Sequence, residues 1–361
     1  MKNVEEIEAC VVEAEFHLET GTFDSVEEFR RCVLLNLHLI AMLPKVARAK
    51  SALFAVSEGK HLRFVNETGQ ELFSNMAAKP LRLMAAYQGA RFNPWVELYL
   101  EACQHSPHAS TMMFNEAIAT SRTPRQCTAY DMANALNGVV GHVVMRSKSE
   151  VFKENLRKWK ARCQSTSKRV EVFTDRLAHE EPFIEMLSFC LIDPTRVVSS
   201  DLANYVLSIR AKLLEALRSR LGQVGRGAVL SARVVPEGIR FDMLLVGRAS
   251  LNFYTENDVR DAWTQATEGR GRCFHLDGNG SEFAYRSMSA SRHLPSSEHR
   301  RRFGLYFGMS SWLVNWECLG AGALTMHEFE APTAQWPFPA QRTPGYLAGS
   351  ISSEFNRMYG R

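Results

Sequence analysis

The segment GAVLSARVVPEGIRFDMLLVG, residues 227–247, constrains the fold more than any other stretch of the chain. Two apolar runs rich in β-branched residues flank Pro236-Glu237-Gly238, a combination that is typical of a β-hairpin. Apolar residues occupy alternate positions of the second arm, namely Ile239, Phe241, Met243 and Leu245. The opposite face of that arm therefore carries Arg240, Asp242 and Leu244. A polar pair in an otherwise apolar strand indicates that this face is not simply core.

The elements around the hairpin follow the order strand, helix, strand, strand, helix, strand. A buried strand is expected at 183–191, and Ser199 or Ser200 is a candidate cap for the helix that follows it. After the hairpin, Thr255 is a candidate N-cap for a helix that ends at Ala266, and a short strand is expected at 269–276. This order is the ferredoxin-like β-α-β-β-α-β pattern, which predicts an α+β fold whose four-stranded antiparallel sheet has helices on one face.

The length of 361 residues is sufficient for two domains and a tail. Helical spacing of apolar residues predicts helices from residue 26, at 95–103 and at 129–144, with a strand pair within 53–65. We therefore predict a mostly helical accessory domain at 1–145, a basic helix and ferredoxin-like core at 146–325, and a Pro/Gly-rich C-terminal tail at 326–361.

Composition excludes several classes of protein. The acidic N-terminus lacks the order of a signal peptide, and the apolar run Val33–Leu43 is too short to cross a bilayer, which predicts a cytoplasmic protein with no membrane partner. The eight cysteines form no C-x-x-C pair and are expected to be reduced thiols. No His or Cys pair has the spacing of a structural zinc site. The formal charge of +4 is too small to indicate a nucleic-acid partner without local clustering.

Such clustering occurs in residues 146–170, where Glu150 and Glu154 oppose many cations. The simplest interpretation is a solvated helix face, and the alternative is a footprint for the phosphates of DNA, with a tryptophan for base stacking. The candidate DNA-binding residues are Arg157, Lys158, Trp159, Lys160, Arg162, Lys168 and Arg169. A later helix expected at 297–314 adds Arg300, Arg301 and Arg302, followed by Tyr306.

Several short motifs resemble those of a known family. They are a Lys/Arg-rich helix before Thr174–Leu177 (TDRL), a strand of the form G-x-x-x-hydrophobic-hydrophobic from Gly238, a helix end from Ala262-Trp263 to Gly271, and RFNPWVELYLEAC at 91–103. Together they resemble the inovirus-type replication proteins of filamentous prophages, which are related to rolling-circle replication initiators. The resemblance covers residues 90 to 315.

The resemblance implies a nicking chemistry whose residues are only partly present. Rolling-circle initiators hold a divalent metal ion with a histidine-hydrophobic-histidine strand, and a helix tyrosine attacks the polarised phosphate. The matching strand positions here are Arg240, Phe241 and Asp242, so both histidines are absent and the metal motif is degenerate. Asp242 offers an oxygen ligand for Mg²⁺ or Mn²⁺, but Arg240 repels a metal ion. Tyr306 is the candidate nucleophile, and a packing role is the alternative.

We therefore favour a DNA-binding, replication-initiator-like protein of a phage or mobile genetic element that lacks nicking activity. Its ligand is expected to be single-stranded or hairpin DNA, with Arg240 among the contacts. Two alternatives stay open. One is an active tyrosine endonuclease that uses Tyr306 with Mg²⁺ or Mn²⁺, which are the only cofactors that the resemblance implies. The other is a non-enzymatic protein-interaction or RNA-binding module, with the N-terminal helical domain as the docking platform.

Overall fold

The structure is a computed structural model. It describes residues 26–75, 90–106, 128–180, 184–198, 200–222, 224–235, 238–248, 253–275, 301, 303–304, 306–308, 312–315 and 317–329. The chain divides into two compact units, 1–330 and 331–361, and every described residue belongs to the first. The predicted domain boundaries at 145/146 and 325/326 stay predictions.

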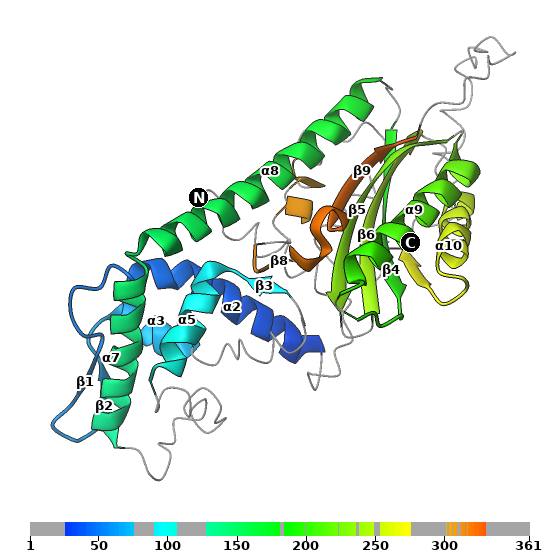
Figure 1. Cartoon of the computed structure of the whole chain (residues 1–361). Coiled ribbons are helices and arrows are strands. Elements are labelled where there is room, and N and C mark those ends of the chain that lie inside the picture. The colour runs from blue at the N-terminus through cyan, green and yellow to red at the C-terminus, as the bar shows by residue number, and fades with distance from the viewer. Residues whose placement is uncertain are drawn as a thin grey trace, which may run out of the picture. The chain divides into compact units, whose positions relative to one another are not determined.

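The first elements of the chain are helices and a small hairpin. They are α2 (Val26–Val46), β1 (Phe54–Val56), β2 (Leu62–Phe64), α3 (Glu67–Asn75), β3 (Arg91–Phe92), α5 (Pro94–Gln104) and α7 (Ala129–Arg146) (Figure 1). Asn93 caps α5 by accepting a hydrogen bond from the Trp95 amide, with Pro94 as the first helical residue. Thr128 and Asp131 form a reciprocal capping box at the start of α7. Ser25, the cap expected for α2, lies outside the described residues.

The basic segment forms a single helix, α8 (Glu150–Glu180), which includes the TDRL motif. Its buried stripe contains Trp159, Cys163 and Val170. At its N-terminal end, the Phe152 ring packs edge-on against the Trp95 ring of α5, with 4.7 Å between the ring centroids. At its C-terminal end, apolar side chains of α8 pack against the main sheet. The helix therefore contacts both the first helices and the sheet.

The main sheet follows the predicted chain order. Its elements are β4 (Ile184–Asp193), α9 (Leu202–Leu221), β5 (Gly225–Val235), β6 (Gly238–Arg248), α10 (Phe253–Ala266) and β7 (Arg272–His275). The strands lie in the order β7-β4-β6-β5-β9, and every neighbouring pair is antiparallel. Mixed helices and antiparallel strands confirm the α+β class. The fifth strand, β9 (Leu324–Glu328), was not predicted, and it pairs with β5 beyond residue 325.

The second arm of the hairpin starts at a position that only glycine fits. Gly238 has a φ of 139°, and a Cβ there would lie 2.0 Å from the Asp193 carbonyl oxygen. The expected helix caps differ from those observed. Asp201 is the N-cap of α9 in place of Ser199 or Ser200, and Thr255 lies inside α10, which begins at Phe253.

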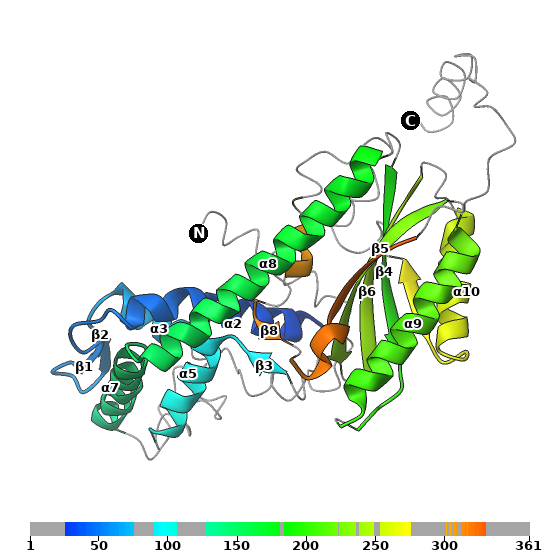
Figure 2. The same cartoon turned by 45° about the horizontal axis from the view of Figure 1, so that its top comes forward.

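Helices cover both faces of the sheet, whereas the sequence pattern predicted helices on one face. On the first face, Phe241, Met243 and Leu245 belong to the same apolar cluster as side chains of α9 and α10. On the second face, Leu244 and Val246 belong to a cluster with α8 and residues 303–307. Figures 1 and 2 show α8 on one side of the strands and α9 and α10 on the other. The second face is covered because Met186, Val229, Leu244 and Val246 make part of it apolar.

A second, short sheet joins segments that are distant in the sequence. β3 pairs with β8 (Val314–Asn315), and the six-residue helix η3 (Glu317–Gly322) follows. The Asn93 side-chain amide donates a hydrogen bond of 3.0 Å to the Trp312 carbonyl oxygen. In the part of the chain that the structure describes, no helix is long and apolar enough to span a membrane.

Candidate functional site

The exposed side of α8 is strongly basic. Between residues 155 and 170 the sequence has six cations and no acidic residue. All six side chains are exposed, namely Arg157, Lys158, Lys160, Arg162, Lys168 and Arg169. Arg162 and Arg169 are seven residues apart, as are Arg169 and Arg176, so these three arginines follow one stripe at every second turn. We call the six cations and Arg176 the α8 basic side.

The ion pairs on this side are exposed and local. Arg157 donates hydrogen bonds of 2.7 and 2.9 Å to the two carboxylate oxygens of Glu154. The Lys168 ammonium lies 3.5 Å from the Glu171 carboxylate. Exposed pairs of this type contribute about 0–1 kcal/mol, so they exchange readily for a phosphate partner. Lys160 and Arg169 have no ion-pair partner among the described residues.

The α8 basic side continues into an open pocket between α8 and the edge strand β9. The pocket has a volume of about 620 Å³ and is lined by Ser165, Lys168, Arg169, Val172, Phe173, Arg176, Met326 and Glu328. The Arg176 guanidinium lies 2.6 Å from the Glu328 carboxylate and 5.9 Å from the centroid of the Phe173 ring. Cations and apolar side chains therefore line one hollow, a combination that suits a phosphate next to an exposed base.

The structure places Trp159 away from this surface. Its side chain is 5 % exposed, and the indole Nε1 donates a hydrogen bond of 2.9 Å to the Trp312 carbonyl oxygen. Position 159 belongs to the buried stripe of α8, although its neighbours Lys158 and Lys160 are exposed. The predicted base-stacking role is therefore replaced by a packing role.

Arg240 and Asp242 are also buried. Asp242 Oδ1 accepts a hydrogen bond of 2.8 Å from Arg240 Nε, and Asp242 Oδ2 lies 3.1 Å from Arg233 Nη2 on β5. All three side chains are at most 4 % exposed. Two guanidinium groups thus occupy the carboxylate that was expected to bind a metal ion, and Arg240 does not reach solvent as DNA contact would require. These placements correct the roles expected for Asp242 and Arg240.

Tyr306 lies on the same sheet face as Arg240 and Asp242, but inside an apolar cluster. The side chain is 2 % exposed, and its ring packs edge-on against Phe307 with 5.1 Å between centroids. Apolar residues of α8, including Val170 and Leu177, belong to the same cluster. A buried hydroxyl does not reach a DNA strand, so this placement matches the packing alternative. Of the three later arginines, Arg301 is exposed, whereas Arg300 and Arg302 lie outside the described residues.

A cluster of one glutamate and two histidines was missed in the sequence. Glu101 on α5, His105 at its C-cap and His142 on α7 place one potential ligand atom each within 4.8 Å of the others. Glu101 Oε1 lies 3.1 Å from His142 Nε2 and 3.0 Å from Arg146 Nε. Partial burial raises the pKa of Glu101, but the hydrogen bond from His142 and the charge of Arg146 together outweigh it and lower the pKa. The available signal was the i, i+4 spacing of Glu101 and His105.

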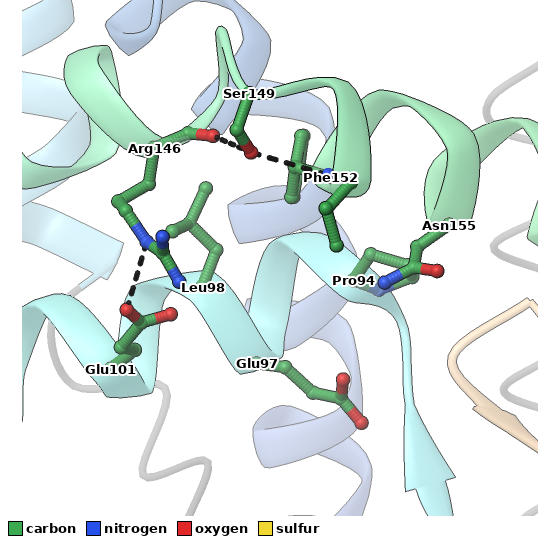
Figure 3. Close-up of a pocket in the computed structure, with 9 residues that line it drawn as sticks. Pro94, Glu97, Leu98, Glu101, Arg146, Ser149, Phe152 and Asn155 are labelled. Carbon is green, nitrogen blue, oxygen red and sulfur yellow. Dashed lines mark hydrogen bonds and ion pairs between the residues drawn. The ribbon is translucent and has the colours of Figure 1, made fainter.

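This cluster borders a second pocket, of about 300 Å³, between α5 and the start of α8. Figure 3 shows Arg146 reaching across to Glu101 at one side of the pocket, with Glu97 and Asn155 on the opposite side. Ser149 caps the first turn of α8 by accepting a hydrogen bond from the Phe152 amide (Figure 3).

Comparison with known proteins identifies no relative of this chain. No family model matches the sequence, and neither the curated proteins nor the solved structures contain a match. The arguments for function therefore depend on the geometry of the described residues.

Proposed function

We propose that this chain is a DNA-binding protein of a phage or mobile genetic element, and that single-stranded or hairpin DNA lies along the α8 basic side. The observation that supports this proposal best is the run of six exposed cations at 155–170 without an intervening carboxylate. α8 has 31 residues, so at about 1.5 Å per residue it provides a straight surface roughly 46 Å long for a phosphate backbone.

The pocket between α8 and β9 supports single-stranded over double-stranded DNA. Its apolar residues, such as Val172 and Met326, offer contact area to a base edge that is exposed only when the strand is unpaired. The Arg176 guanidinium adds a planar cation next to the same hollow. Trp159 and Arg240 have no part in the proposed interface, because both are buried.

We propose that the sheet is a ferredoxin-like core like that of replication initiators, with residues 1–145 as an accessory domain. The central positions of β4 and β6 and the chain order β4-α9-β5-β6-α10-β7 support the ferredoxin-like topology. We further propose that the nicking chemistry is absent. The ion pairs of Asp242 and the burial of Tyr306 support this part of the proposal.

The binding experiment compares salt dependence. Fluorescence anisotropy with a labelled single strand long enough to span α8 should give a dissociation constant that rises steeply with salt. Replacing Lys160 and Arg169 by alanine should weaken binding and reduce the slope of log K against log salt by about two, since each lost phosphate contact reduces it by about one. Lys212→Ala and Arg260→Ala on α9 and α10 are the matched controls, because they remove exposed cations from the other side of the sheet.

Two outcomes would contradict the proposal. Absence of binding at low salt would exclude DNA as the ligand. Equal slopes for the α8 double variant and the control variant would exclude α8 as the interface and would favour the protein-interaction alternative.

The absence of nicking is tested separately. Labelled single strands incubated with the protein and Mn²⁺ should yield no covalent adduct. An adduct that forms with the wild type and disappears in Tyr306→Phe would instead establish the endonuclease alternative.

A further inference from the structure

From the Glu101–His105–His142 cluster we infer a binding site for a single divalent transition-metal ion of the Zn²⁺ type. Two imidazoles and one carboxylate form a ligand set that proteins use for Zn²⁺ with a fourth, open position. The inference is independent of the proposed DNA-binding function, because it concerns α5 and α7 and not the α8 basic side.

The spacing of the donor atoms is close to what one ion requires. Two ligands about 2.0–2.1 Å from a tetrahedral ion lie roughly 3.3 Å from each other. His142 Nε2 and Glu101 Oε1 are already 3.1 Å apart, and all three donor atoms lie within 4.8 Å of one another. His105 is exposed, so a small rotation of its ring brings the third donor into range.

The orientation of His105 suits a metal ligand. Its Nδ1 lies 2.8 Å from the Glu101 carbonyl oxygen. A carbonyl oxygen only accepts hydrogen bonds, so Nδ1 carries the proton and the lone pair of the neutral ring is on Nε2. Metal-binding histidines commonly donate the other ring N–H to a backbone carbonyl in this way. The His105 ring also stacks on that of His142, with 4.7 Å between centroids, so both rings face the same space.

Arg146 is the group that competes with a metal ion. Its Nε contacts the same Glu101 oxygen that faces His142, and its positive charge disfavours a second cation there. The side chain is 51 % exposed and lies at the rim of the second pocket, so it can turn into solvent when an ion binds (Figure 3). The proton that His142 Nε2 shares with Glu101 is released at the same time. An arginine that competes with the ion gives the inference a distinctive test.

The experiment uses the full chain without a histidine tag, after treatment with a chelator. Calorimetric titration with Zn²⁺, and titration with Co²⁺ followed by its visible absorption, should both show one bound ion. His105→Ala should weaken binding at least tenfold, and because His105 is exposed this variant should fold normally. His61→Ala is the matched control, because it removes another exposed histidine from the hairpin region and should bind as the wild type does.

Arg146→Gln separates a metal site from a mere ion-pair network. If Glu101, His105 and His142 bind the ion, removing the competing guanidinium should tighten Zn²⁺ binding severalfold. The inference is overturned if the wild type binds no stoichiometric Zn²⁺, if His105→Ala and His61→Ala bind equally well, or if the Co²⁺ complex has the strong near-ultraviolet thiolate absorption of cysteine ligands.

Discussion

Asp242 is the residue whose surroundings differ most from those of an active-site carboxylate. It lies on the central strand β6, and its two oxygens contact Arg240 and Arg233 in the interior of the protein. Such a cluster contributes little net stability compared with apolar packing, but removal of one partner leaves a buried charge uncompensated. The role of Asp242 is therefore electrostatic and structural.

We predict that Asp242→Asn lowers the free energy of unfolding by about 3–5 kcal/mol, because two buried guanidinium groups lose their counter-charge. Urea denaturation followed by circular dichroism measures the change. Glu154→Gln, which breaks an exposed ion pair on α8, is the control and should cost about 0–1 kcal/mol. If both variants are as stable as the wild type, the ion-pair assignment is wrong.

The buried thiols Cys103 and Cys163 give a prediction of reactivity. Burial raises the pKa of each to about 12, so at pH 8 almost none of either is thiolate. Both should resist iodoacetamide in the folded protein and react rapidly in urea, where the pKa returns to its ordinary value. Peptide mass spectrometry identifies the modified sites. Equal labelling of Cys163 in the folded and unfolded protein would contradict its burial.

At this scale, the sequence supported inferences about faces but not about partners. Alternation along the second arm of the hairpin placed Arg240 and Asp242 on one face, as the structure has them. The contact of Asp242 with Arg233 depends on the register between β5 and β6, which alternation alone does not determine. His142 is 41 residues from Glu101, so only the packing of α7 on α5 brings these two residues together.

Among the elements, α8 has the most demanding packing. Residues 306–308 are helical, and a Cβ on Gly308 would lie 2.0 Å from Ser167 Oγ and 2.7 Å from the Cys163 carbonyl oxygen of α8. A Cβ on Gly304 would lie 2.7 Å from the Ser167 carbonyl oxygen. Glycines at this spacing of four allow the two backbones to approach closely.

Gly308→Ala should therefore destabilise the protein by about 1–3 kcal/mol, because the added methyl group forces α8 and residues 306–308 apart. Gly141→Ala on α7 is the matched control. No atom lies within 4 Å of a Cβ at that position, and alanine favours a helix by up to about 1 kcal/mol relative to glycine. Thermal unfolding of both variants provides the test, and a Gly308→Ala variant with an unchanged melting temperature would refute the close approach.

Elements with strong local patterns were predictable. The hairpin has a turn signal between two alternating arms, and α7 and α9 repeat apolar residues at helical intervals. The strand β9 was missed because five residues (LTMHE) are too few to establish a period, and their position depends on pairing with β5. α8 was recognised by its charge, but its apolar stripe also buries Trp159, which was expected at the surface.

The whole molecule depends on contacts between segments that are distant along the chain. Asn93 is buried; its oxygen accepts a hydrogen bond from the Trp95 amide, and its nitrogen donates one to the Trp312 carbonyl. One side chain thus caps α5 and connects that helix to residues 312–315 next to β8.

Asn93→Ala should lower the free energy of unfolding by about 2–4 kcal/mol, since a helix cap and a buried hydrogen bond are lost together. Asn75→Ala removes an amide that bonds only within its own helix α3, and it should cost much less. Chemical denaturation of the two variants compares them. Similar losses in both would show that the contact with Trp312 has little effect on stability.

The pairing of β3 with β8 also has a consequence for biosynthesis. A ribosome adds about 5–20 residues per second, so the 219 positions that separate Asn93 from Trp312 take roughly 10 to 45 seconds to synthesise. Throughout that interval the nascent polypeptide holds Phe92, almost fully buried in the finished protein, without its partner strand. Completion of the amino-terminal half must therefore wait for translation of the last quarter of the message.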